Sequence, residues 1–171
     1  MEGDWETPCT INDTWGYKYY DDNWKSPEDL IRLLVNCAAK GVNYLLNVGP
    51  TAEGIIPEPS VARLKAVGQW LKVNGEAIYG TRATPFPCDF DWGRVTCKAD
   101  RIYLHVMEWA DEPLRLAGLR NRVLGARLLA DGGELGTNEI ARRTGINAST
   151  VSRLLATLAS ARFVEHLPET G

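Results

Sequence analysis

The chain has 171 residues, of which 44% are hydrophobic, and its formal net charge is -3. This length fits one ordinary domain or two small ones, and this hydrophobic content excludes disorder along the whole chain. A net charge so close to zero gives no global attraction to nucleic acid, so any DNA binding would have to come from a local patch.

The first predicted elements alternate between strand and helix. Residues 5–11 predict a short strand, and a helix is expected from the cap at Ser26 to about Lys40, with Pro27 at its first position and Gly41 as its left-handed stop. Residues 43–48 predict a second strand, whose continuous apolar run indicates a parallel strand covered on both faces. A second helix over about 60–74 completes two successive βα units.

Beyond Gly80 the pattern changes to antiparallel strands and then to helices. Residues 94–98 and 101–107 predict two strands around a turn at 99–100, with Ile102, Leu104 and Val106 on one face, as in a β-sandwich appendage. Residues 139–144 and 149–158 predict two helices separated by a short turn, and residues 163–166 predict a strand.

The amino-acid composition also changes along the chain. All six tryptophans lie at or before Trp109, and every lysine lies before Arg101, whereas the last third uses arginine alone. Because this shift coincides with the change in structural pattern, we expect two parts of different origin that meet between Asn121 and Gly133.

The cysteines and histidines show no ligand or redox motif. The four cysteines have no close pairing such as C-x-x-C, and with only two histidines we expect free thiols, no metal and no cofactor. No apolar run approaches the roughly 20 residues that span a bilayer, and the acidic start is unlike an export signal. We therefore expect a cytoplasmic product with no membrane partner.

Four blocks in the first 80 residues share one resemblance. They are residues 5–17 (WETPCTINDTWGY), 41–51 (GVNYLLNVGPT), 54–57 (GIIP) and 70–80, which contains NGEAIYG. In this order they are similar to α-L-fucosidases, the retaining glycoside hydrolases of family twenty-nine. The resemblance covers about residues 2–131. It implies an α/β fold: the last βα units of a TIM-type barrel over 1–80, then a partial antiparallel β-sandwich over 81–131.

The resemblance also indicates what these residues lack. Retaining glycosidases use two carboxylates about 5 Å apart, one as the nucleophile and one as the proton donor. In the resembled family both lie upstream of the Trp-Glu block, as do the histidines that hold fucose. Five acids of this chain are candidate substitutes, and each falls in a predicted loop or cap, where a solvated surface acid is expected: Asp13, Asp21, Asp22, Glu53 and Glu58. We therefore expect no catalytic residue and no independent catalysis.

One part of a sugar pocket is implied by the resemblance. Trp15 matches the position whose ring packs against the methyl side of fucose, and residues 12–15 and 49–51 are expected at the mouth of the barrel. The alternative is that Trp15 is a core residue. Trp5 and Glu6 are expected near the pocket as further substrate-binding residues, unless Glu6 only satisfies backbone groups. The other four tryptophans are expected to pack.

The C-terminal segment has a second resemblance. Residues 133–155 are similar to the winged helix-turn-helix of IclR-type transcriptional regulators, and residues 163–171 to the start of its wing. The resemblance implies an all-α helix-turn-helix domain over 132–171, with its first helix beginning as early as 122. Five residues would contact duplex DNA: Thr137, Ser149, Thr150, Ser152 and Arg153. The alternative is that these helices only pack.

Three hypotheses follow. The leading one is a chimeric reading frame joined at residues 122–132, which fit both families, with fucosidase identity over most of its length. The second is a DNA-binding regulator with an incidental N-terminal half, and the third is a sugar-binding module. The partners expected are a fucosylated glycan, bound weakly by these residues, duplex DNA at the C-terminal helices, and further copies of the chain, because two βα units leave sheet edges uncovered.

Overall fold

The computed structural model describes residues 3–108 and 114–123. The chain divides into two compact units, residues 1–107 and 108–171, and all the named elements belong to the first. The helices and the strand predicted between residues 139 and 166 lie outside the described residues. The domain boundaries predicted near residues 80 and 131 stay predictions.

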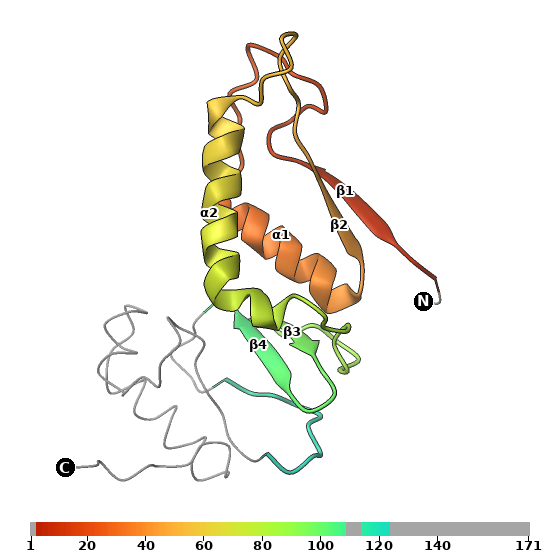
Figure 1. Ribbon diagram of the computed structural model, residues 1–171. Coiled ribbons are helices and arrows are strands. Elements are labelled where there is room, and N and C mark those ends of the chain that lie inside the picture. The colour runs from red at the N-terminus through yellow and green to blue at the C-terminus, as the bar shows by residue number, and fades with distance from the viewer. Residues whose placement is uncertain (1–2, 109–113, 124–171) are drawn as a thin grey trace, which may run out of the picture. The chain divides into compact units, whose positions relative to one another are not determined.

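The first unit begins with a parallel pair of strands and two helices (Figure 1). Strand β1 (Glu6–Thr10) pairs with β2 (Asn43–Asn47), in a register that runs from Glu6 opposite Asn43 to Thr10 opposite Asn47. Helix α1 (Pro27–Lys40) connects them, and helix α2 (Glu58–Asn74) follows β2. The two predicted βα units are thus confirmed, with α2 beginning two residues earlier than expected.

Helix α1 is defined by its ends, as the sequence predicted. The Ser26 hydroxyl accepts a hydrogen bond from the Asp29 backbone N–H at 3.0 Å, and the Asp29 carboxylate accepts one from the Ser26 backbone N–H at 3.3 Å. This reciprocal pair satisfies two donors at the start of the helix, and it lowers the pKa of Asp29. Gly41 ends the helix with φ 67°, a left-handed conformation that favours glycine.

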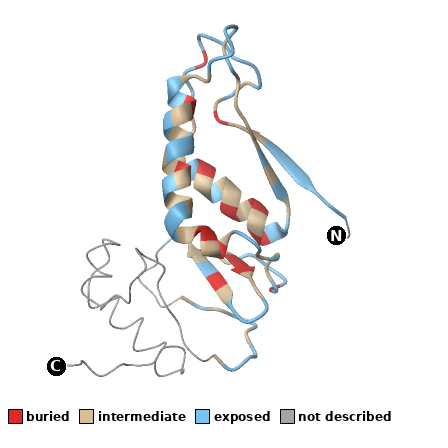
Figure 2. Ribbon diagram, in the orientation of Figure 1, coloured by how far each residue is buried: buried red, intermediate tan, exposed pale blue. Residues whose placement is uncertain are grey.

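The core lies where the two helices meet the end of β1. Ile11, Leu30 and Val67 are its buried centre, and six half-buried side chains pack around it: Trp24, Ile31, Leu34, Leu46, Val48 and Leu71. Figure 2 shows these buried positions on the helices and at the end of β1, while β1 itself is largely exposed. Burying Ile11 and Leu30 each contributes about 1.5–3 kcal/mol, so this cluster holds the two βα units together.

Strand β2 is covered on one face only, which corrects the prediction of a strand covered on both. Leu46 packs into the core, but Leu45 on the opposite face is 45% exposed. The reason is that both helices of the described unit pack on one side of the two-stranded sheet (Figure 1). The continuous apolar run of β2 is typical of a strand with both faces covered, but the described residues cover only one face.

A second sheet packs at the far end of α2. Strand β3 (Gly93–Cys97) pairs antiparallel with β4 (Ile102–Val106), within one residue of both predicted strands at either end. The predicted face of Ile102, Leu104 and Val106 is not the one that packs on the helical part, since Leu104 is 42% exposed. Tyr103 and His105 alternate with these residues and form the packed face, where their polar atoms make hydrogen bonds.

Hydrogen bonds join this face to the short 3-10 helix η1 (Gly75–Ala77). The Thr96 hydroxyl donates to the Ala77 carbonyl at 2.7 Å, and the Tyr103 hydroxyl donates to Glu76 Oε1 at 2.9 Å. His105 Nε2 lies 2.9 Å from the Thr96 oxygen. Because the Thr96 hydroxyl donates its one proton to the Ala77 carbonyl, its oxygen accepts the hydrogen bond from Nε2–H of the neutral His105 ring. Burial lowers the pKa of His105 to about 4.

This pKa predicts a loss of stability in mild acid. With a folded pKa below that of free histidine, the unfolded chain takes up the proton first, so stabilisation present at pH 7 is lost as the pH falls. Between pH 7 and pH 5 we expect a loss of roughly 2 kcal/mol in the free energy of unfolding. Urea unfolding at a series of pH values measures it, with His105→Gln as the matched variant. Equal pH profiles for the two proteins would contradict the assignment.

Candidate functional site

Two loops meet at one end of the parallel sheet. Residues 11–26 follow β1 and residues 48–57 follow β2, and both leave from the C-terminal ends of their strands, where Thr10 pairs with Asn47. Figure 1 shows the two loops together beyond the first turn of α2. This end of the sheet is where parallel α/β folds place their binding residues, because loops from neighbouring strands converge there.

Contacts from the end of β2 fix the position of the first loop. The Asn47 side-chain amide donates a hydrogen bond to the Trp15 carbonyl oxygen at 2.7 Å. Gly49 lies against the same stretch of backbone: a Cβ atom there would come within 2.9 Å of the Tyr17 nitrogen and 3.0 Å of the Gly16 carbonyl carbon. Backbone atoms cannot move aside as a flexible side chain does, so glycine is required at this position.

Hydrogen bonds inside the first loop fix its outer part. The Thr14 hydroxyl donates to Asp21 Oδ2 at 2.7 Å, and the Asn23 amide donates to both carboxylate oxygens of Asp13, at 3.1 and 3.0 Å. Lys25 Nζ donates to the Asn12 carbonyl at 2.9 Å. The outer part of the loop is therefore ordered by polar side chains rather than by apolar packing.

The candidate catalytic acids lie in these loops or at the start of α2. Asp21 is only 8% exposed, so the expectation of a solvated surface acid is wrong at this position. The Thr14 hydroxyl lowers the pKa of Asp21, and the Thr51 hydroxyl lowers the pKa of Glu53. A proton donor needs a raised pKa, so these shifts have the wrong sign for that role. Asp22 lies exposed in the loop and Glu58 exposed at the first position of α2, where solvated acids were predicted.

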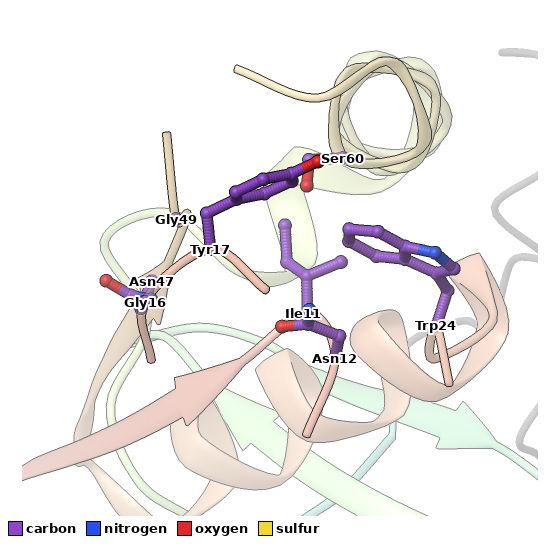
Figure 3. A pocket seen from close by; sticks show the side chains of 8 residues that line it. All are labelled: Ile11, Asn12, Gly16, Tyr17, Trp24, Asn47, Gly49 and Ser60. Carbon is purple, nitrogen blue, oxygen red and sulfur yellow. The ribbon is translucent and has the colours of Figure 1, made fainter. Parts of the chain in front are cut away.

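A small hollow lies between the two loops and α2 (Figure 3). Eight residues line it: Ile11, Asn12, Gly16, Tyr17, Trp24, Asn47, Gly49 and Ser60. The rings of Tyr17 and Trp24 stand on either side of Ile11, and Ser60 comes from the first turns of α2. Arg63 lies over the Trp24 ring at 5.6 Å, and its Nε donates to the Lys25 carbonyl at 2.6 Å, so Trp24 packs as predicted while also lining the hollow.

The predicted sugar-binding residues fall into two groups. Trp15 lies in the loop after β1 and is 52% exposed among the described residues. Trp5 and Glu6 lie at the other end of β1, and their expected place near the pocket stays a prediction. Glu6 opens β1 opposite Asn43, and four residues of extended strand, about 13 Å, separate it from Thr10.

Sequence reasoning missed Tyr17 and Ser60 as lining residues. Tyr17 follows Trp15 within the same predicted loop, but no local pattern reports the approach of its backbone nitrogen to Gly49 or its place beside the hollow. The five predicted DNA-contacting residues fall outside the described residues. Within the part that the structure describes, no three His, Cys, Asp or Glu side chains are grouped as metal ligands, and the four cysteines are free thiols. In the same stretches, no helix combines the length and apolar character needed to cross a bilayer.

Comparisons with known proteins confirm both resemblances drawn from the sequence. Residues 1–76 match the family model described as Alpha-L-fucosidase, and residues 127–168 match the one described as the IclR helix-turn-helix domain. The chain is similar to alpha-L-fucosidases in its N-terminal part. Plasma alpha-L-fucosidase of Rattus norvegicus is 45% identical over 80 residues, which are 45% of this chain and 17% of that protein. Alpha-L-fucosidase of Dictyostelium discoideum is 34% identical over 139 residues, 77% of this chain and 30% of that protein.

Solved structures agree with this similarity. Alpha-L-fucosidase isoenzyme 1 from Paenibacillus thiaminolyticus is 44% identical, with a TM-score of 0.72 over 77% of this chain and 31% of its own. The Thermotoga maritima alpha-fucosidase in complex with fucose is 38% identical, with a TM-score of 0.54 over 58% of this chain and 25% of its own. The chain spans less than a third of the length of these relatives.

Proposed function

We propose that residues 3–107 form one wall of a fucoside-binding (β/α) barrel followed by the start of a β-sandwich. Two parallel βα units and an antiparallel pair, in this order, support the proposal, as do the solved fucosidases to which the chain is similar. The observation that carries it is the exposed Trp15 ring at the C-terminal end of β1, where barrel enzymes hold their substrates.

In this proposal Trp15 supplies the apolar face for the sugar. C–H groups of a deoxy sugar pack on an aromatic ring, and a ring whose backbone is fixed by Asn47 loses little freedom on binding. The hydroxyl group of Tyr17, a residue that is 46% exposed in the same loop, is suited to contact the sugar's polar edge. The substrate contacts expected for Trp5 and Glu6 stay predictions.

We further propose that these 171 residues alone do not hydrolyse fucosides. The retaining reaction needs a nucleophilic carboxylate and a proton donor about 5 Å apart. At the mouth, Asp13 and Asp21 are held by Asn23 and Thr14, and neither faces the hollow as a lining residue.

The assay is release of the aryl group from an aryl α-L-fucoside. We expect turnover no higher than that of a buffer blank, for the wild-type chain and for Glu6→Gln and Asp21→Asn alike, because no carboxylate pair is in place. Turnover by the wild type that disappears in Glu6→Gln would show that this acid takes part in catalysis, and would overturn the proposal.

A second function is supported by the match of residues 127–168 to the IclR helix-turn-helix domain. We propose that this segment binds duplex DNA through the predicted second helix, with Ser149, Thr150, Ser152 and Arg153 toward the groove and Thr137 at a phosphate. The N-terminal half is then a separate part, joined between residues 121 and 133 as a chimera.

The test of the second function is a DNA titration at two salt concentrations. Wild-type affinity should fall steeply with salt, because phosphate contacts release counterions. If Arg153 meets a base edge, Arg153→Ala should cost about 1–3 kcal/mol. Arg162→Ala, outside the predicted second helix, is the matched control and should cost much less. Equal affinities for wild type and Arg153→Ala, or no salt dependence, would reject the assignment.

We also propose that copies of the chain associate through the β1–β2 sheet. Leu45 is exposed on the face opposite the helices, and a two-stranded sheet has unpaired backbone groups along both outer edges. Such edges and apolar faces are the features through which strands of different chains pair. This proposal is independent of the sugar and DNA sites.

A further inference from the structure

The loop after β1 carries more exposed aromatic surface than the Trp15 contact uses. Tyr19 is 83% exposed, Tyr20 is 64% exposed and Tyr17 is 46% exposed, all within five residues of Trp15. None of the three belongs to the hydrophobic core of the unit. Exposed apolar patches, when contiguous, mark interaction surfaces or ligand-binding sites.

The rings are arranged rather than loose. Tyr19 and Tyr20 contact each other edge to face, with centroids 5.2 Å apart and an interplanar angle of 88°. The Lys18 ammonium lies 5.8 Å from the centre of the Tyr20 ring. The Asp21 backbone N–H donates to the Lys18 carbonyl at 3.1 Å, which closes the turn that presents both tyrosines.

One end of this turn is tied to the end of β2, and the other end is tied back to the start of the same loop. On one side, Asn47 holds the Trp15 carbonyl and Gly49 lies against the backbone at Gly16. On the other side, the Asp21 carboxylate accepts from Thr14. The surface is therefore already ordered in the free protein, so a ligand that stacks on these rings causes little further loss of conformational entropy.

The chemistry of the surface favours a neutral sugar ring. Tyrosine offers an aromatic face for C–H groups and a hydroxyl for a sugar hydroxyl, at the entropy cost of two side-chain torsions. Lys18 is the one cation in the turn, and the carboxylates of Asp21 and Asp22 follow directly, so the local charge does not favour sulfated or acidic sugars.

We propose that Tyr19 and Tyr20 form a second carbohydrate subsite, which holds the neutral sugar ring linked to the fucose at Trp15. The position next to Trp15 rests on the proposed function, while the stacking of a neutral ring on the two tyrosines does not. The subsite adds affinity for the linked ring and leaves the affinity for free fucose unchanged.

The experiment is an NMR titration of the full chain with three probes. They are L-fucose, a fucosyl disaccharide whose second ring is a neutral hexose, and a disaccharide of that hexose without fucose. We expect the fucosyl disaccharide to bind about fivefold or more tightly than fucose, the size of an added aromatic contact. The double variant Tyr19→Ser with Tyr20→Ser should lose this gain, and Tyr19→Phe with Tyr20→Phe should keep most of it.

A matched control tyrosine lies at the other end of α2. Tyr79 is 62% exposed and follows the C-terminal end of the helix, whereas Ser60 in its first turn lines the hollow. A helix of 17 residues is about 25 Å long. Tyr79→Ser should therefore leave the affinity of every probe unchanged. This result would show that the loss of an exposed tyrosine elsewhere does not lower the affinity for sugars.

The outcomes separate the subsite from the proposed function. If fucose binds and Trp15→Ala weakens it, but the disaccharide gains nothing or the double serine variant keeps the gain, the subsite is wrong and the fucose contact stands. If no probe with fucose binds, the fucose contact is wrong, and the hexose disaccharide decides the subsite. If the hexose disaccharide binds to the wild type but not to the double serine variant, the stacking surface is supported. If it does not bind to the wild type, the proposal is overturned.

Discussion

Gly49 has no side chain at a point where the exit of β2 meets the backbone of the neighbouring loop. Any Cβ there would lie about 3 Å from three backbone atoms of residues 15–17, so the two loops can approach only through glycine. The Asn47 amide adds a 2.7 Å hydrogen bond to the Trp15 carbonyl beside this contact. Together they fix the backbone at residues 15–17, which carries the Trp15 and Tyr17 side chains and leads into the turn at residues 18–21.

The rest of the unit supports this junction from below. The capping pair of Ser26 and Asp29 begins α1 directly after the loop, and the buried Ile11 joins the end of β1 to Leu30 and Val67 on the helices. The loop is thus anchored by apolar burial at its root and by polar contacts at its tip. This division suits a binding site, because the root stays rigid while polar and aromatic groups at the tip remain available to a ligand.

Local signals made the helices predictable, whereas non-local contacts decided the details of the site. Pro27 and Gly41 specify the ends of α1 within a few residues of sequence, and both ends were predicted. The approach of Gly49 to the loop joins segments more than thirty residues apart, and no local pattern reports it. Apolar patterns alone also do not predict which strand faces are buried, since Leu45 and Leu104 lie on faces that the described residues do not cover.

The most direct test of this account is Gly49→Ala against Gly68→Ala. Position 68 lies in α2 with nothing within 4 Å of an added Cβ, so alanine there should be neutral or stabilise by about 0.5–1 kcal/mol. Gly49→Ala must displace backbone, and we expect a loss of roughly 1–3 kcal/mol in the free energy of unfolding. The Asn47 side-chain amide protons should also lose their protection from exchange. An unchanged free energy of unfolding with an unchanged Asn47 amide in Gly49→Ala would contradict the claim that this contact positions the site.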